Sequence, residues 1–390
     1  MSELRHSGSV IKRAFWPSFF ILPAFAFTLI TNLNCNLLFW CAGCALLLGM
    51  LVFGLPKRFP ATPLALAFCL YIAVLLGNHS WLDPAVTPES IYFIAYPAGS
   101  FVLFSCLTRA QGMAVFRLVM VVVCLLAGWG LLQYLTGELV LTSMGTRSTA
   151  LFTTPNTFAN LLGLFLLPVI AGYLYGKGDR TLYGIGCLLF AAFLTTQSRG
   201  GYLAMFCGAV SLLLVIYLCN RDLDIRNRLF RLLCGAGLIL TLFLGVQYHR
   251  AVDSDWQGSG MTEAIADLDK ALPLAGMAQS GGHRLMLYRI AWQRIKERPW
   301  LGHGYFNFQY FNTRDQQQPF IGFSTRYVHN DYLQVWLETG IAGLLALLVM
   351  ISLFYYQSWQ CLKTSAGDDR IVCIALVAAL GFYFAHAMVD

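Results

Sequence analysis

The 390-residue chain is far more apolar and far less charged than a soluble globular protein. Hydrophobic residues make up 58% of it and charged residues 12%, whereas soluble domains carry about 25% charged residues. The formal net charge is +7. These values exclude a soluble enzyme and predict a polytopic membrane protein, whose excess cations belong to loops on one side of the bilayer rather than to a nucleic-acid-binding surface.

Eleven apolar segments are long enough to cross a hydrocarbon core of roughly 30 Å. All should be α-helices, because lipid offers no hydrogen-bond partner to an unpaired backbone amide. We therefore predict an all-α integral membrane protein with nine spans in residues 1–247, one long polar loop in residues 248–337 and two spans in residues 338–390. In chain order the predicted spans are 14–32, 35–54, 61–77, 90–107, 113–134, 157–175, 181–197, 200–219, 229–247, 338–358 and 370–389.

The Lys and Arg residues predict the orientation of these spans. They cluster in the N-terminal segment and in every second connection after it, whereas the opposite short connections hold only Arg147 and Arg199. By the positive-inside rule the N-terminus is cytoplasmic and the long loop faces outward. None of the twelve cysteines lies in that loop, so we expect no disulfide framework. The pair Cys41 and Cys44, inside an apolar segment, is expected to pack rather than to bind a metal.

Arg199 lies in the outer turn T-T-Q-S-R-G-G at residues 195–201. A guanidinium group at membrane depth is costly, and it usually faces a protein interior or a water-filled substrate path. An interfacial arginine can also reach a lipid phosphate. The neighbouring glycines would let a ligand approach the backbone closely, which favours a bound anion.

Arg147 precedes the stretch P-N-T-F-A at residues 155–159, which begins the next span. Asn156 or Thr157 is the expected N-cap of that helix. A helix start explains this stretch as well as a binding site does, so Arg147 is a secondary candidate.

Residues 282–299 show apolar side chains at helical spacing and predict an amphipathic helix on the membrane surface. We expect Arg284 in its first turn, where the side chain and the unpaired backbone amides would face an anionic group. The other cations of this helix are expected to contact anionic headgroups: Arg289, Arg294, Lys296 and Arg298.

His329 lies where the long loop turns into the tenth predicted span. Proximity to a helix N-terminus favours the neutral imidazole, which a general base requires. A single histidine also serves often as a capping or packing residue, so spacing alone leaves both roles open.

Several motifs together resemble the O-antigen ligase superfamily. They are S-R-G-G at 198–201, G-x-R at 282–284, R-P-W-L-G-H-G at 298–304 and H-N-D-Y-L-Q-V-W-L-E-T-G at 329–340, with P-N-T-F-A at 155–159 fitting as well. The resemblance implies a GT-C-type glycosyltransferase of the bacterial inner membrane that needs no metal or other cofactor. Such an enzyme moves a glycan from undecaprenyl diphosphate to an acceptor hydroxyl on the periplasmic face. Lipid A core is the first expected acceptor, and a protein (protein O-oligosaccharyltransferase) or another glycan (O-antigen polymerase) is the alternative.

The resemblance also implies roles for individual residues. Arg199 and Arg284 would bind the diphosphate, whose developing negative charge fixed guanidinium groups can stabilise. His329 would remove the acceptor proton, and in-line attack would invert the anomeric carbon. Asn330 beside it is a secondary candidate. So is Asp390, which resembles a family acid at the outer end of the last span; since family members commonly continue through another helix, we expect a shortened chain.

Two other functions stay open on the sequence. A metal-dependent glycosyltransferase would use D-x-D patterns, which occur at residues 222–224, 253–255 and 267–269 but arise readily by chance; we expect no metal site there. A transporter of lipid-linked glycans would also need outward arginines. Transporters typically show internal repeats and broken helices, and the sequence indicates neither.

Overall fold

In a computed structural model of the protein, every regular element among the described residues is a helix. The described residues are 63–82, 109–137, 147–152, 154–176, 179–219, 223–255, 275–315, 325 and 327–388. Several predictions therefore lie outside them: the spans at 14–32, 35–54 and 90–107, the Cys41 and Cys44 pair, Asp222, the acids at 267–269, and Asp390.

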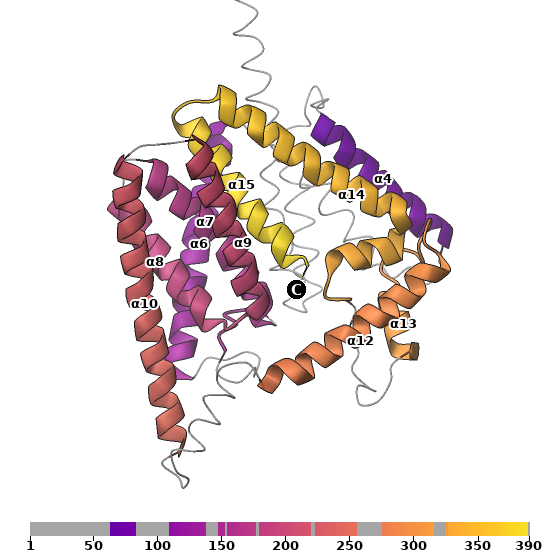
Figure 1. The fold of residues 1–390 in the computed structure, drawn as a ribbon, viewed down its shortest axis with the longest axis horizontal. Coiled ribbons are helices and arrows are strands. Elements are labelled where there is room, and N and C mark those ends of the chain that lie inside the picture. The colour runs from indigo at the N-terminus through magenta and orange to yellow at the C-terminus, as the bar shows by residue number, and fades with distance from the viewer. Residues whose placement is uncertain are drawn as a thin grey trace, which may run out of the picture.

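The eight predicted spans within the described residues each coincide with a helix. Six helices are long and apolar enough to cross a membrane, and α4 and α8 are shorter apolar helices, which confirms a polytopic membrane protein. Figure 1 shows the elements: α4 (Pro63–Leu82), α6 (Arg109–Thr136), α7 (Pro155–Tyr175), α8 (Arg180–Thr195), α9 (Arg199–Cys219), α10 (Leu223–Asp255), α12 (Ala275–Glu297), α13 (Phe308–Asp315), α14 (Asp331–Thr364) and α15 (Asp368–His386).

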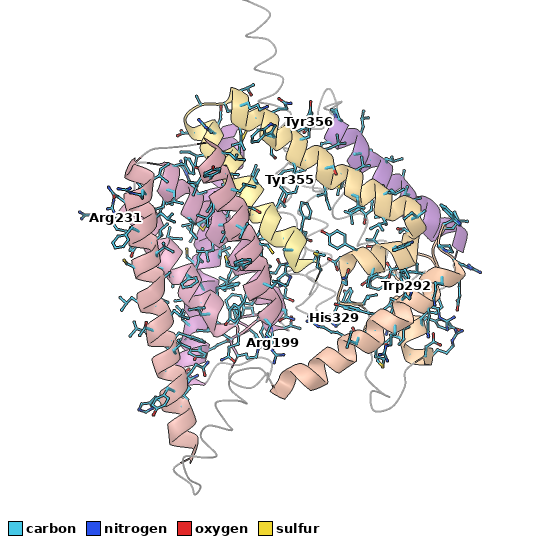
Figure 2. The ribbon with its side chains drawn as sticks, in the orientation of Figure 1. Arg199, Arg231, Trp292, His329, Tyr355 and Tyr356 are labelled. Atoms are coloured by element: carbon cyan, nitrogen blue, oxygen red, sulfur yellow. A yellow bond between two sulfur atoms is a disulfide. The ribbon has the colours of Figure 1, made fainter. Side chains whose placement is uncertain are left out.

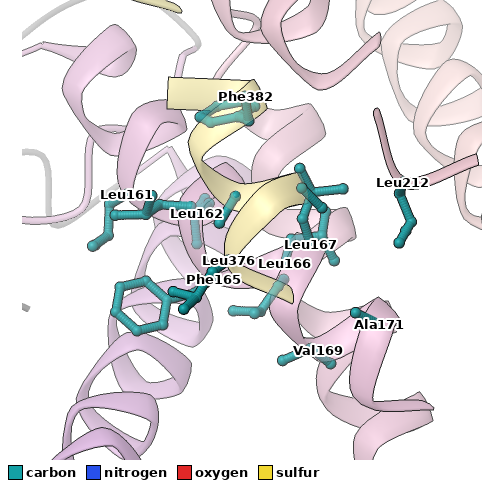
Figure 3. Close-up of a cluster of buried hydrophobic side chains, with 14 of the residues drawn as sticks. Leu161, Leu162, Phe165, Leu166, Leu167, Val169, Ala171, Leu212, Leu376 and Phe382 are labelled. Carbon is teal, nitrogen blue, oxygen red and sulfur yellow. The ribbon is translucent and has the colours of Figure 1, made fainter. Parts of the chain in front are cut away.

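The main core lies where α15 packs against α7 and α9 (Figure 3). Phe382 on α15 packs closely against two glycines, because a Cβ atom at Gly163 would lie 2.2 Å from the Phe382 ring and one at Gly208 would lie 2.9 Å from the Phe382 Cβ. Small residues allow helices to approach closely in a membrane, where packing rather than the hydrophobic effect drives association. These contacts fix α15 between α7 and α9.

A second, smaller core joins α12, α13 and the start of α14. Leu287 and Ile290 of α12 are buried against Phe308, Val328 and Leu337. Figure 1 shows α12 running across the end of the molecule toward the lower end of α9. This core holds the segment that carries His329 against α12.

Helix α14 is broken at Gly340, where φ is 68° and ψ is −172°, a conformation almost restricted to glycine. The segment 299–304 replaces the lost helical hydrogen bonds. The amides of His303 and Gly304 donate to the carbonyls of Leu337 and Glu338, both at 2.9 Å, and the Ile341 amide donates to the Pro299 carbonyl at 2.9 Å. We call this arrangement the 299–304 latch. The sequence indicated no broken helix, and that expectation is wrong.

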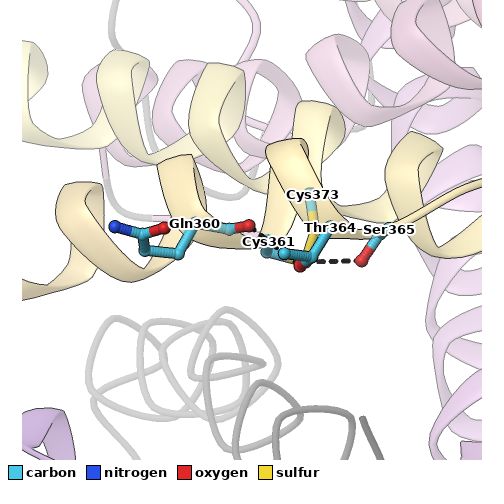
Figure 4. Close-up of a disulfide and its surroundings, with 5 residues drawn as sticks. All are labelled: Gln360, Cys361, Thr364, Ser365 and Cys373. Carbon is cyan, nitrogen blue, oxygen red and sulfur yellow. Dashed lines mark hydrogen bonds between the residues drawn. A yellow bond between two sulfur atoms is a disulfide. The ribbon is translucent and has the colours of Figure 1, made fainter. Parts of the chain in front are cut away.

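Cys361 near the end of α14 and Cys373 on α15 form a disulfide (Figure 4). The sequence predicted no disulfide framework, and it did not indicate this single pair, which lies outside the long outer loop. The disulfide joins the two helices beside their short connection, and the Cys361 sulfur also lies 3.2 Å from the Ser365 hydroxyl. This connection is at the opposite end of α14 from His329.

Candidate functional site

Three arginines from separate segments gather at one end of the molecule. Arg199 is the first residue of α9, Arg284 lies on α12, and Arg147 lies in the segment before α7. Burial lowers the pKa of Arg147, the Tyr202 hydroxyl opposes this shift, and the positive charges of Arg199 and Arg284 lower the pKa further. These interactions place Arg199 and Arg284 each within electrostatic range of Arg147.

The segment that carries Arg147 is held between α6 and the turn before α9. The Ser148 amide donates to the Thr195 carbonyl at 3.0 Å. On the other side, the Gln133 side chain of α6 donates to the Ala150 carbonyl at 2.9 Å and accepts from the Ala150 amide at 2.8 Å. Arg147 Nε then donates to the Thr196 carbonyl at 3.0 Å, so the guanidinium group has a fixed orientation beside Arg199.

Asn156 connects Arg147 to the turn of Arg199. Its Oδ1 accepts from the Ser198 hydroxyl at 2.9 Å and from Arg147 Nη2 at 3.4 Å. The predicted N-cap role for Asn156 or Thr157 is wrong, because Thr154 caps α7 by accepting from the Thr157 amide at 3.2 Å. The P-N-T-F-A stretch thus starts a helix and also supplies a side chain to the site.

The glycines after Arg199 serve helix packing. Both Gly200 and Gly201 are buried, and a Cβ atom at Gly201 would lie 3.0 Å from the Cβ of Ala159. The expectation that these glycines admit a ligand is therefore wrong for Gly201, which lets α9 approach α7 and so keeps Arg199 near Asn156. The Arg199 side chain itself is exposed.

Arg284 is not at a helix start. Helix α12 begins at Ala275, so Arg284 lies in its third turn, where backbone amides are already bonded within the helix. The predicted contribution of a helix N-terminus to anion binding here is wrong. Arg294 also differs from expectation, because it donates to Asp315 of α13 at 2.8 Å and to Glu297 at 2.8 Å instead of being left to lipid headgroups.

His329 is held by Tyr288, which lies one helical turn after Arg284 on α12. The His329 carbonyl accepts from the Tyr288 hydroxyl at 3.1 Å, and the His329 Nε2 lies 3.5 Å from the Thr325 hydroxyl. Burial raises the pKa of Tyr288 although Arg284 opposes the shift, so the hydroxyl keeps the proton that it donates. Figure 2 shows His329 beside α12 and Arg199 at the nearby end of α9.

Asn330 caps α14. Its Oδ1 accepts from the Leu333 amide at 3.1 Å, so helix capping alone accounts for an asparagine at this position. The start of α14 is also docked on the end of α15, since the Asp331 amide donates to the Ala387 carbonyl at 2.7 Å and the Tyr332 hydroxyl to the Phe384 carbonyl at 3.0 Å. His329 is therefore fixed relative to α15 as well as to α12.

The described residues include four non-glycine residues with left-handed backbone, and all lie in loops around this site: Ala150 (φ 49°), Gln197 (φ 50°), Phe306 (φ 72°) and His329 (φ 60°). Such conformations persist only where the surroundings hold them, and they concentrate at functional sites. The described acids of the D-x-D patterns lie on α10, where Asp253 and Asp255 are in the last turn and Asp224 is in the first.

Comparison with known proteins finds a match in the part of the chain that carries this site. Residues 184–348 match the family model described as O-antigen ligase, which confirms the predicted resemblance to the O-antigen ligase superfamily. The matched region contains Arg199, Arg284 and His329. A curated protein of Haemophilus influenzae, described as uncharacterized, is 24% identical over 201 residues. That alignment covers 50% of this chain and 47% of the relative, so the chain spans about half the length of the relative that it matches.

Proposed function

Since residues 184–348 carry the O-antigen ligase pattern, we propose that the protein is a GT-C-type glycosyltransferase that transfers a glycan from undecaprenyl diphosphate to an acceptor hydroxyl at the periplasmic face of the bacterial inner membrane. The observation that carries the proposal is the gathering of Arg147, Arg199 and Arg284 at the end of the bundle where His329 lies.

The three arginines fit the diphosphate. Like charges within electrostatic range destabilise one another, and a ligand with two phosphates would relieve that repulsion. Guanidinium groups present several donors in a planar fork that matches phosphate oxygens. As the bond between the anomeric carbon and the diphosphate oxygen breaks, the electron pair and the negative charge move onto the diphosphate. Donors held in place beforehand stabilise this charge in the transition state.

His329 fits the role of base. The neutral imidazole accepts the proton of the acceptor hydroxyl while the acceptor oxygen forms the new bond to the anomeric carbon. Attack from the side opposite the diphosphate inverts that carbon. The isoprenoid chain of the donor stays among the helices in lipid, which accounts for an active site at the end of a membrane bundle. Lipid A core is the proposed acceptor, and a protein or a second glycan is the alternative within the same superfamily.

The test uses the purified full-length protein in lipid nanodiscs with an undecaprenyl-diphosphate-linked glycan. Lipid A core, a candidate protein or no added acceptor is supplied separately, and the product identifies the acceptor class. His329→Asn should reduce transfer to a small residual rate; asparagine is chosen because it tolerates the left-handed backbone of this position. Near-normal transfer by that variant would exclude His329 as the base.

The diphosphate role is tested by donor binding. Arg199→Ala and Arg284→Ala should weaken binding of the donor, and lysine at either position should restore little because the planar fork is lost. Unchanged donor affinity in both alanine variants would contradict the proposal. Transfer should persist during thorough chelation; activity that is lost on chelation and restored by a divalent cation would favour the D-x-D alternative instead.

A further inference from the structure

Two buried side chains on the first turns of α14 connect to the backbone beside His329. Gln334 is 9% exposed and Glu338 is 1% exposed. The Val328 amide donates to Gln334 Oε1 at 3.1 Å, and Gln334 Nε2 donates to Glu338 Oε1 at 3.1 Å. Gln334 therefore uses both ends of its amide, one toward the residue before His329 and the other toward a carboxylate.

Glu338 joins this connection to the loop between α12 and α13. The backbone amides of Phe306 and Phe308 also lie within interaction range of its carboxylate. Phe306 has left-handed backbone, and the Glu338 carbonyl is itself part of the 299–304 latch. A buried carboxylate with several polar partners is strongly fixed, and removal of one partner leaves a buried polar group unpaired.

The His329 backbone is thus held from both sides. Gln334 fixes the amide of the preceding residue, and the Tyr288 hydroxyl fixes the His329 carbonyl at 3.1 Å. Between these two contacts His329 has a φ of 60°, a conformation that costs a non-glycine residue free energy and persists only when its surroundings impose it. This backbone conformation sets the direction in which the His329 side chain leaves the chain.

We propose that Gln334 and Glu338 are positioning residues that hold His329 in its catalytic orientation, with Glu338 acting through Gln334. The inference rests on the proposed function, because it presumes that His329 is the base. Neither side chain is assigned contact with substrate.

The hydrogen-bond pattern allows an exchange test. In Glu338→Gln, the new NH2 group replaces an oxygen that accepted hydrogen bonds. It must then face another donor, either the Gln334 NH2 group or the backbone amides of Phe306 and Phe308. In Gln334→Glu, two carboxylates face each other. In the double variant Gln334→Glu with Glu338→Gln, residue 334 again accepts from Val328 and from residue 338, and residue 338 again presents an oxygen to the loop amides. We expect kcat to fall about 10- to 100-fold in each single variant, as misplacement of a catalytic group by about 1 Å does, and to recover in the double variant.

A second measurement separates positioning from general stability. Residues that act as a unit show non-additive losses, so Glu338→Gln should lower kcat in the wild-type background and cause no further loss in the His329→Asn background. Donor affinity should stay unchanged in both. Thr339→Val is the matched control, because Thr339 is equally buried and its hydroxyl bonds only the Val335 carbonyl of its own helix at 2.6 Å. Its effect on kcat should be small.

The outcomes are distinguishable. Equal losses from Glu338→Gln in both backgrounds, an unchanged kcat in that variant, or a double variant no more active than the single variants would overturn the positioning role while leaving His329 as the base. Near-normal transfer by His329→Asn alone would instead overturn the proposed function.

Discussion

Gly340→Ala tests the 299–304 latch. A Cβ atom at Gly340 would lie 2.1 Å from the Trp300 carbonyl oxygen, and the backbone there has a φ of 68°. An alanine can respond in two ways. It can stay in this conformation and push the Trp300 carbonyl away, or it can continue α14 as a regular helix. Either response separates segment 299–304 from α14.

The expected cost follows from what is lost. A residue forced into the glycine-only region costs about 1–3 kcal/mol, and each of the three backbone hydrogen bonds of the latch contributes about 1 kcal/mol. We therefore expect a loss of about 4–6 kcal/mol in the free energy of unfolding of this part of the protein if both contributions are lost. In thermal terms this is a fall in the unfolding temperature on the order of 5–10 °C.

The measurement is thermal unfolding of the purified protein in nanodiscs, together with backbone hydrogen exchange of residues 299–308. Gly237→Ala is the matched control, because Gly237 is a helical residue of α10 with nothing within 4 Å of a Cβ atom; it should be neutral. The Gly340→Ala variant should exchange faster at residues 303 and 304. If both variants unfold at the wild-type temperature with unchanged exchange, the latch does not stabilise the fold and the reasoning fails.

Three further predictions concern the site and its loop. Arg147→Ala should weaken donor binding about 10-fold, and Arg147→Lys should recover little, because a lysine cannot bond both Thr196 and Asn156; equal binding by wild type and both variants would remove Arg147 from the site. Inorganic pyrophosphate should raise the unfolding temperature of the wild type more than that of Arg147→Ala, since ligands that bind only the folded state stabilise it; an identical shift in both would argue against binding at this arginine. Burial lowers the pKa of His303, although its hydrogen bond to the Arg294 carbonyl opposes the shift. As pH falls, the unfolded chain therefore binds a proton at this histidine before the folded protein does, so this contribution to stability is present above about pH 6.5 and is lost below it. The unfolding temperatures of wild type and His303→Gln should converge from pH 7.5 to pH 5.5. Parallel curves would contradict the assignment.

Much of the helical framework follows from the sequence, since apolar length alone predicted eight segments that coincide with described helices, six of which are long and apolar enough to cross a membrane. The placement of Arg199 and His329 at the same end also followed from charge and chain order. These are properties of local segments and of the bilayer, and each can be evaluated without knowing how helices pack.

The sequence failed to predict features of the helices that depend on tertiary contacts. Helix α12 continues upstream through Gly281 and Gly282 to Ala275, so Arg284 is in mid-helix. The break at Gly340 depends on a segment 36 to 41 residues earlier in the chain that supplies replacement hydrogen bonds. Gln334 and Glu338 read as ordinary residues of an amphipathic helix start, and only their three-dimensional partners reveal the connection to His329.

Helix α12 also fixes the spacing between two parts of the site. Arg284 and Tyr288 are four residues apart, which places them on one helical face with roughly 6 Å between them along the axis. One of them contributes to the group of arginines and the other holds the His329 carbonyl. Insertion or deletion of a single residue between them would rotate one side chain away from the other by about 100°. The spacing of these two residues therefore sets the position of Arg284 relative to the His329 backbone in a way that length changes elsewhere in the loop do not.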